Sequence, residues 1–299
     1  MKKLIDFLKE NKIPFEENVD GKRLCSFHVG GIVNVVARPE NAEQLVRLFA
    51  YLNESKIKNI VIGKGSDIVI SDRGYDGVII LLSNFTSLSV DENSIVAGAG
   101  VSMLKLANFS QQNALAGLEF AQGIPGSVGG GVYMNAGAYG GEMSQVLSSC
   151  LVINKKNGML FVLDACDCDF SYRHSAFMDN KDLIVLFATF DLQKGNSEII
   201  KAKMDEMRAK RSASQPLEYP SAGSTFKRPV GHFAGKLIED AGLKGFSIGG
   251  AQVSEKHAGF VINRGGATAD DIKKLVEYIQ KTVKEKFDVS LECEIEFVE

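Results

Sequence analysis

The sequence contains no tryptophan, no long hydrophobic run and almost no net charge. Its 299 residues include 18 Phe and 7 Tyr, which supply aromatic bulk, and its formal net charge is −3. Nucleic acids and anionic membranes are bound by a concentrated basic face, so this balance predicts neither partner. The most apolar stretches, residues 78–82 and 183–190, are far shorter than the roughly 20 residues of a membrane span. A hydrophobic content of 45% excludes a largely disordered chain.

Cysteine is also scarce, and the chain contains an odd number of five. An odd count in a chain of this length does not indicate a disulfide framework. Cys166 and Cys168 form one C-x-C, with no second pair at zinc-ligand spacing, so we expect reduced thiols and no metal. Charged residues interrupt the apolar positions of residues 1–10, unlike a secretory signal, and we therefore expect a cytoplasmic protein.

The length suggests about two domains. Helical periodicity predicts helices over residues 1–18, 42–53 and 102–113, and β-branched runs predict strands at residues 60–62, 78–82, 94–97 and 183–186. This mixture favours an α+β or α/β fold. A polar stretch over residues 194–216 precedes a smaller unit with two helices, one over residues 232–241 and one that starts at Thr268.

Glycine is abundant, and its clusters are the first functional clue. The chain has 30 glycines, about a tenth of its residues against a usual value of roughly 7%. Nine of them fall within residues 117–141, and a separate Gly-Lys-Gly-Ser-Asp at residues 63–67 follows a predicted strand. The latter resembles a phosphate-binding nest of backbone N–H groups, although it matches neither a Rossmann nor a P-loop motif. Together the two clusters favour a bound dinucleotide; the alternative is glycine-rich turns packed on helices.

Three polar segments follow the glycines. In residues 171–175, Arg173 could hold a carboxylate or phosphate with its planar guanidinium, or it could be an ordinary surface arginine. Residues 220–229 combine hydroxyls with two cations, as in an anion-binding loop or a tight turn. At the end of the chain, glutamates alternate with apolar residues and predict a C-terminal strand with either a solvated or a functional acidic face.

These segments, taken in order, resemble the bacterial UDP-N-acetylenolpyruvoylglucosamine reductases. The resemblance covers about residues 24–295 and rests on residues 63–67, 117–141, 172–175, 220–229, 233–238 and 249–263. It is to the shorter form of the family, without a long loop after Tyr172 and Arg173. It implies an α+β fold, with a two-part FAD-binding domain of the vanillyl-alcohol-oxidase type over residues 1–200, divided at about residue 80. It also implies a smaller C-terminal α+β substrate domain over residues 201–299, and a monomeric protein.

The resemblance also implies a reaction. NADPH would reduce non-covalently bound FAD, and a hydride would then pass to C3 of UDP-N-acetylglucosamine enolpyruvate, giving UDP-N-acetylmuramate for peptidoglycan. Arg173 and Glu294 would stabilise the developing charge, and Ser224 would deliver a proton to C2. The implied substrate-binding residues are Tyr172, Lys227, Arg228, Gln252 and His257. The implied cofactor-binding residues are Gly63, Lys64, Gly65, Ser66, Asp67, Ala121, Gly123, Ile124, Pro125, Gly126, Ser127, Gly130, Asn135 and Ala138.

Two departures from the family pattern leave alternatives open. Asp67 stands where the family more often has asparagine, and Cys293 replaces the proline that usually precedes the catalytic glutamate. Glu292 and Glu296 lie two residues to either side of Glu294, so the register of the strand decides among the three. An FAD-dependent oxidase of a sugar or alcohol, and a nucleotide-sugar sensor without catalysis, are the rival functions.

Overall fold

The computed structural model describes residues 1–299 as two compact units, each built from separate parts of the chain. Unit 1 comprises residues 1–17, 35–63 and 77–210, and unit 2 comprises residues 18–34, 64–76 and 211–299. The expected boundary between the FAD-binding and substrate domains, at residue 200, lies inside α6 (Ser197–Ser214). The division into those two domains stays a prediction. The units interleave along the sequence because the chain crosses from one to the other five times.

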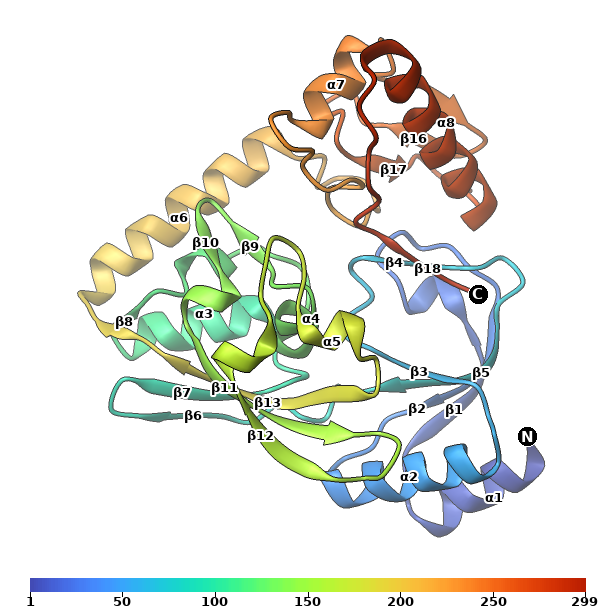
Figure 1. The fold of residues 1–299 in the computed structure, drawn as a ribbon, viewed down its shortest axis with the longest axis vertical. Coiled ribbons are helices and arrows are strands. Elements are labelled where there is room, and N and C mark those ends of the chain that lie inside the picture. Colours follow the sequence, from blue (N-terminus) through green and yellow to red (C-terminus); the bar gives the residue numbers. More distant parts are fainter. The chain divides into compact units, whose positions relative to one another are not determined.

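One part of unit 1 is built on a sheet covered by two helices, and three of the strands extend along the chain into residues of unit 2. The sheet has the order β1-β2-β5-β3, and α1 and α2 lie together on one of its faces (Figure 1). Leu48 and Phe49 of α2 pack with Val78 and Ile80 of β5 in its core. The bounds are α1 (Lys2–Glu10), β1 (Phe15–Asp20), β2 (Ile32–Ala37), α2 (Ala42–Glu54), β3 (Asn59–Ile62) and β5 (Tyr75–Leu81).

A five-stranded antiparallel sheet forms the other part of unit 1. Its order is β12-β11-β13-β7-β6, and α3 and α4 pack against it through a core that includes Leu106 and Val132. The bounds are β6 (Leu88–Asp91), β7 (Ser94–Gly98), α3 (Met103–Gln112), α4 (Val128–Tyr133), β11 (Leu147–Asn154), β12 (Leu160–Asp164), α5 (Ala176–Asp179) and β13 (Leu183–Asp191). Two short antiparallel pairs accompany it: β8 (Leu115–Ala116) with β14 (Gln193–Lys194), and β9 (Gly137–Ala138) with β10 (Gly141–Glu142).

Unit 2 combines a small antiparallel sheet with two helices and a parallel pair of strands. In the sheet, β15 (Ser247–Ile248), β16 (Ala251–Val253) and β17 (Val261–Asn263) follow one another, and α7 (Ala234–Asp240) and α8 (Ala269–Phe287) pack nearby (Figure 1). The parallel pair is β4 (Ile68–Ile70) with β18 (Glu296–Val298). Thr268 caps α8 and, with Asp271, forms the expected capping box.

Two expected elements are shorter in the structure. The first helix ends at Glu10 rather than near residue 18, because Pro14 lacks an N–H group and disfavours helical backbone before it. The C-terminal strand begins only at Glu296, where the ladder with β4 starts. Before it, the chain lies instead beside residues 225–227, with Cys293 opposite Phe226. Alternating polarity indicates extended backbone but does not identify its partner.

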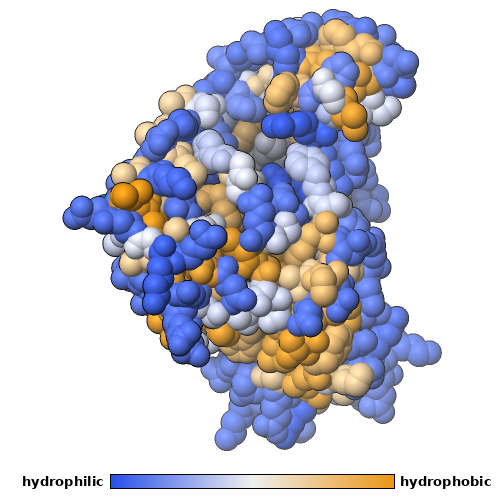
Figure 2. Space-filling model, turned by 60° about the vertical axis from the view of Figure 1, so that its left-hand side comes forward, coloured by the Kyte–Doolittle hydropathy of each residue, from blue (hydrophilic) through white to orange (hydrophobic).

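No helix is both long and apolar enough to cross a bilayer. On the face drawn in Figure 2, hydrophilic residues predominate and hydrophobic residues gather in separate patches between them. Unit 1 contributes exposed apolar side chains from three strands of its antiparallel sheet, namely Val90, Val96 and Val162.

Candidate active site

Arg173 lies in a tight turn of unit 1, where its backbone is left-handed with φ 54°. The N–H groups of Ser171 and His174 donate to each other's carbonyls, both at 3.2 Å, and close the turn. The Arg173 guanidinium donates to the carbonyl oxygen of Gly137 at 2.9 Å and to that of Asn135 at 3.5 Å. It also lies 5.1 Å from the ring centroid of Tyr172, which is half-exposed. The structure thus gives Arg173 a specific conformation rather than that of an ordinary surface arginine.

Asn135 connects the glycine-rich segment to this turn. Its side chain is fully buried; Nδ2 donates to the Ser171 carbonyl at 2.9 Å, and Oδ1 accepts from the Ser144 N–H at 3.0 Å. We expected Asn135 among the cofactor ligands, but both of its side-chain polar groups are used within the protein. The side chain therefore positions the Arg173 turn. Sequence reasoning missed this role because the two motifs are 36 residues apart.

The two glycine clusters meet within unit 1 at the start of α4. Ser127 is the N-cap of this helix, and its Oγ accepts from the Gly130 N–H at 3.5 Å. A Cβ atom added to Gly63 would lie 2.5 Å from the same Oγ, so no larger residue fits there without movement. Part of the glycine content nevertheless serves packing, since a Cβ on Gly129 would lie 2.9 Å from the Cβ of Ala99. Packing therefore explains some of these glycines, and the phosphate-binding interpretation of the others stays a prediction.

The loop before α4 presents free backbone donors. No backbone hydrogen bond of the chain uses the N–H groups of Gly123, Gly126 or Ser127. Gln122 is buried, with 8% of its surface exposed, and its side-chain Oε1 has no hydrogen-bond partner. Unpaired N–H groups in a glycine loop suit a phosphate, and an unpaired buried oxygen suits a ligand donor. These groups fit the pyrophosphate and polar ring of a dinucleotide such as FAD.

The remaining residues of the first glycine motif, Lys64 to Asp67, belong to unit 2. The Gly65 carbonyl accepts from the Ser26 N–H at 2.9 Å, which fixes the loop. Burial, with smaller contributions from the nearby Glu296 and Glu294 carboxylates, raises the pKa of the Asp67 carboxyl to about 6, against the effect of its own backbone hydrogen bond. The departure at Asp67 thus adds an acid that holds its proton more tightly than a surface aspartate.

Ser224 and Glu294 lie on neighbouring extended segments of unit 2. Thr225 joins them: its carbonyl accepts from the Glu294 N–H at 2.9 Å, and its hydroxyl accepts from the Val261 N–H at 3.0 Å. Thr225 is fully buried, whereas the preceding Ser224 is exposed. Sequence reasoning missed Thr225 as a positioning residue, although its place directly after Ser224 in a small-residue loop was a signal.

The neighbouring glutamates differ in their surroundings. Glu292 has a side chain 71% exposed and forms an ion pair with Lys227 at 2.5 Å. Glu294 and Glu296, in contrast, are only partly exposed, and both act electrostatically on Asp67, which is itself partly exposed. These surroundings distinguish Glu292 from the other two glutamates, but they do not show whether Glu294 or Glu296 is the catalytic one.

The other expected substrate residues also lie in unit 2. The guanidinium of exposed Arg228 stacks over the ring of Phe233 at 4.6 Å. The Gln252 Nε2 donates to the Gly245 carbonyl at 3.0 Å, while its buried Oε1 has no partner. The His257 Nδ1 accepts from the Gly259 N–H at 3.1 Å, and burial lowers the pKa of the ring. His257 is therefore neutral at pH 7 and has Nε2–H as its free donor.

Comparison with known proteins identifies the family. Residues 33–164 match the family described as FAD binding domain, and residues 215–298 match UDP-N-acetylenolpyruvoylglucosamine reductase, C-terminal domain. A protein named UDP-N-acetylenolpyruvoylglucosamine reductase from Caldanaerobacter subterraneus is 49% identical over 99% of this chain and 97% of its own length. One of that name from Clostridium novyi is 46% identical over 99% of this chain and 95% of its own.

A solved structure agrees with these matches. The reductase of the same name from Thermus caldophilus superposes with a TM-score of 0.82 at 32% sequence identity, over 96% of this chain and 100% of that one. The expected α+β fold and FAD-binding domain are thereby confirmed. The chain belongs to the UDP-N-acetylenolpyruvoylglucosamine reductase family of FAD-dependent oxidoreductases.

Proposed function

We propose that this chain reduces UDP-N-acetylglucosamine enolpyruvate to UDP-N-acetylmuramate, with NADPH as the source of the hydride, in peptidoglycan precursor synthesis. The observation that carries the proposal is the 49% identity over 99% of the chain to a reductase named for this substrate. The assignments of individual residues rest on their surroundings within each unit.

The cofactor is held by the glycine-rich segments. Gly63 and Gly130 flank Ser127 Oγ, and the N–H groups of Gly123, Gly126 and Ser127 are free to bind the pyrophosphate. When bound, FAD supplies the carrier that takes a hydride from NADPH and gives one to the substrate. Because the flavin takes part in both half-reactions, the protein must keep it bound while NADPH and then the enolpyruvyl substrate bind and dissociate.

Arg173 binds the carboxylate of the enolpyruvyl group. That carboxylate gains negative charge as the hydride reaches C3, and a planar guanidinium matches its geometry. The carbonyls of Asn135 and Gly137 accept hydrogen bonds from this guanidinium and limit its movement. A donor fixed before the reaction stabilises the developing charge without a reorganisation cost.

Ser224 donates a proton to C2, and Glu294, together with Arg173, stabilises the developing charge. A serine is a weak acid, so this role requires a strongly basic, carbanion-like carbon and close positioning. Buried Thr225 provides that positioning, because it is hydrogen-bonded to Gly259, Val261 and Glu294. Ser224 itself is exposed and so can reach a substrate.

The nucleotide part of the substrate is bound by Tyr172 and by residues of unit 2. The cations Lys227 and Arg228 suit a diphosphate, and the neutral His257 offers one N–H donor. The unpaired Oε1 of Gln252 would accept from a ligand donor. Lys227 is paired with Glu292, so its ammonium group would have to leave that carboxylate to bind a phosphate.

The test is anaerobic spectroscopy of the purified protein. We expect a yellow protein that loses its flavin absorbance with NADPH and regains it when UDP-N-acetylglucosamine enolpyruvate is added. Bleaching without recovery would contradict this substrate; recovery on admission of oxygen alone would then favour the oxidase. A protein that binds UDP-N-acetylglucosamine enolpyruvate but never bleaches would favour the non-catalytic sensor.

A further inference from the structure

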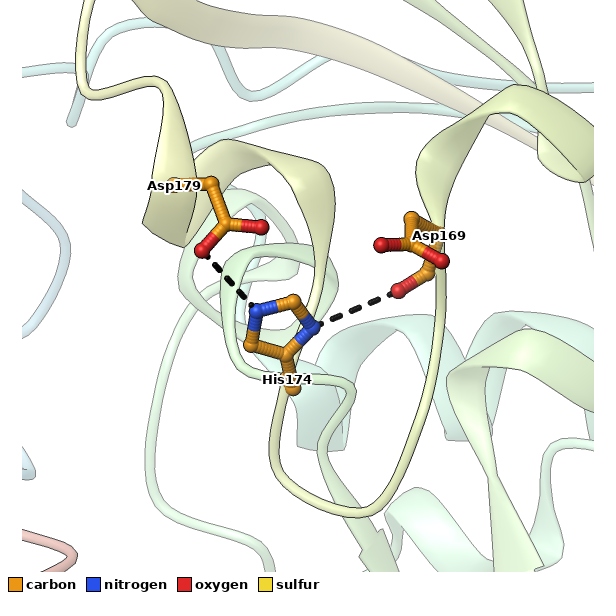
Figure 3. A group of neighbouring side chains, drawn as sticks. All are labelled: Asp169, His174 and Asp179. Carbon is orange, nitrogen blue, oxygen red and sulfur yellow. Dashed lines mark hydrogen bonds and ion pairs between the residues drawn. The ribbon is translucent and has the colours of Figure 1, made fainter.

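His174, directly after Arg173, lies between two acidic residues of unit 1 (Figure 3). Its Nε2 is 3.1 Å from the carboxylate Oδ1 of Asp179, the last residue of α5. Its Nδ1 is 3.4 Å from the backbone carbonyl oxygen of Asp169, which has left-handed backbone with φ 45°. The ring therefore joins Asp169, which precedes the Arg173 turn, to Asp179 at the end of α5, which follows the turn.

Both atoms that face the ring are hydrogen-bond acceptors. A carbonyl oxygen cannot donate, and neither can an ionised carboxylate. A neutral imidazole carries one N–H group, whereas the imidazolium carries two, so only the protonated ring satisfies both contacts. The hydrogen bond to Asp179 raises the pKa of His174, and the Asp169 carbonyl and the charges of Asp179 and Asp169 raise it further against the effect of burial. Those two carboxylates are the charged groups that act on the ring.

The same three residues could be considered as a metal site, because each has a ligand atom within 4.8 Å of the others. Figure 3 shows, however, that the ring stands between Asp179 on its Nε2 side and Asp169 on its Nδ1 side. Nδ1 faces the Asp169 carbonyl oxygen and Nε2 faces the Asp179 carboxylate, so both ring nitrogens already have hydrogen-bond acceptors within the protein. The geometry favours a hydrogen-bonded clamp over a chelate.

The clamp encloses a strained segment. Arg173 has left-handed backbone, which costs free energy for a residue with a Cβ and persists only where the surroundings impose it. Two residues after Arg173, buried Ser175 donates from Oγ to the Tyr133 carbonyl at 2.5 Å and fixes the C-terminal side of the turn. The tie between Asp169 and Asp179 spans the turn from outside and limits how far it can open.

We propose that His174 is a positioning residue whose imidazolium form ties Asp169 to Asp179 and holds the Arg173 turn, and that loss of its proton at higher pH releases the turn. The consequence for turnover rests on the proposed function of Arg173, while the clamp itself does not. The charged state is stabilised by the folded chain, so the tie is complete well below pH 6.5 and weakens as pH rises through the raised folded-state pKa.

Nuclear magnetic resonance of the FAD-loaded protein with ¹⁵N-labelled histidine tests the clamp directly. The chain has four histidines, and His174→Gln identifies the resonances of this one. We expect the ring nitrogens of His174 both to carry protons in mild acid and to titrate with a midpoint above 6.5, the ordinary value for histidine. A ring that titrates at or below 6.5 would overturn the proposal whatever the enzyme's activity.

Two matched variants separate the clamp from a chelate. Asp179→Ala removes the carboxylate partner, which is the largest cause of the raised pKa, and should lower the midpoint of His174. Asp169→Ala keeps the backbone carbonyl that Nδ1 faces and should lower it much less. Equal shifts of the midpoint in both variants would contradict the assignment. A chelate would instead show itself if equimolar Zn²⁺ perturbed the His174 resonances of the wild type but not those of Asp169→Ala, and this result would also contradict the clamp.

The consequence for turnover has its own readout. With NADPH and UDP-N-acetylglucosamine enolpyruvate, the wild-type kcat should fall at alkaline pH with the His174 midpoint, and this fall should be absent in His174→Gln, whose kcat is low at every pH. A confirmed midpoint with an unchanged pH profile in His174→Gln would overturn the positioning role. A confirmed midpoint in a protein without reductase activity would instead contradict the proposed function and leave the clamp standing.

Discussion

Replacement of Asp67 by asparagine should stabilise the protein at neutral pH and much less in acid. Burial and the neighbouring Glu296 and Glu294 raise the pKa of Asp67 from 3.8 to about 6. Its contribution to stability is therefore fully present below pH 3.8, where folded and unfolded chains are both protonated, and is lost as pH rises through 6. Asparagine has nearly the same shape and never ionises, so it avoids this loss.

The size of the effect follows from the shift. A difference of about two pKa units corresponds to roughly 3 kcal/mol in the free energy of unfolding once the pH is well above 6. About 2 kcal/mol of this should develop between pH 4.5 and 7.5, since part of the loss is already present at the lower pH. Subtraction of the two proteins' values removes the contributions of all groups that titrate alike in both.

Urea unfolding at pH 4.5, 6 and 7.5, followed by circular dichroism at one FAD concentration, measures this difference. Asp6→Asn, on the exposed face of α1, is the control for the loss of one carboxylate from the chain. A difference between Asp67→Asn and wild type that does not change with pH, or that grows toward acid, would refute the electrostatic explanation. Equal slopes of unfolding free energy against urea concentration are needed for the comparison.

Three further predictions concern turnover and cofactor binding. Ser224→Ala should leave flavin bleaching by NADPH intact but slow substrate-driven recovery about 10²–10⁴-fold in stopped-flow absorbance; near-normal recovery would remove Ser224 from the acid role. Among single Gln replacements of Glu292, Glu294 and Glu296, only Glu294→Gln should strongly lower kcat, and a larger defect at Glu296 would show that the register is wrong. Gly63→Ala should weaken FAD retention measured by fluorescence titration, because its methyl would collide with the N-cap hydroxyl of α4; unchanged affinity would exclude this cradle.

The sequence predicted well those features that depend on near neighbours. The helix that begins after Thr268 follows from a capping box four residues long, and its apolar positions are buried as expected. The strands at residues 60–62, 78–82, 94–97 and 183–186 lie within or overlap β3, β5, β7 and β13. Local propensity and hydrophobic periodicity act over a few residues, so they can be identified without the fold.

The sequence by itself also identified the family and the candidate residues, through motifs that keep their order along the chain. Only the tertiary structure decided how those residues are held. It placed Asp67 near Glu294 by pairing β4 with β18, and it joined Asn135 to the Arg173 turn through a buried side chain. Contacts between residues far apart in sequence depend on packing and strand register, which no local pattern specifies. For the same reason the partner of residues 292–294, and the two acidic neighbours of the His174 ring, became visible only in the folded chain.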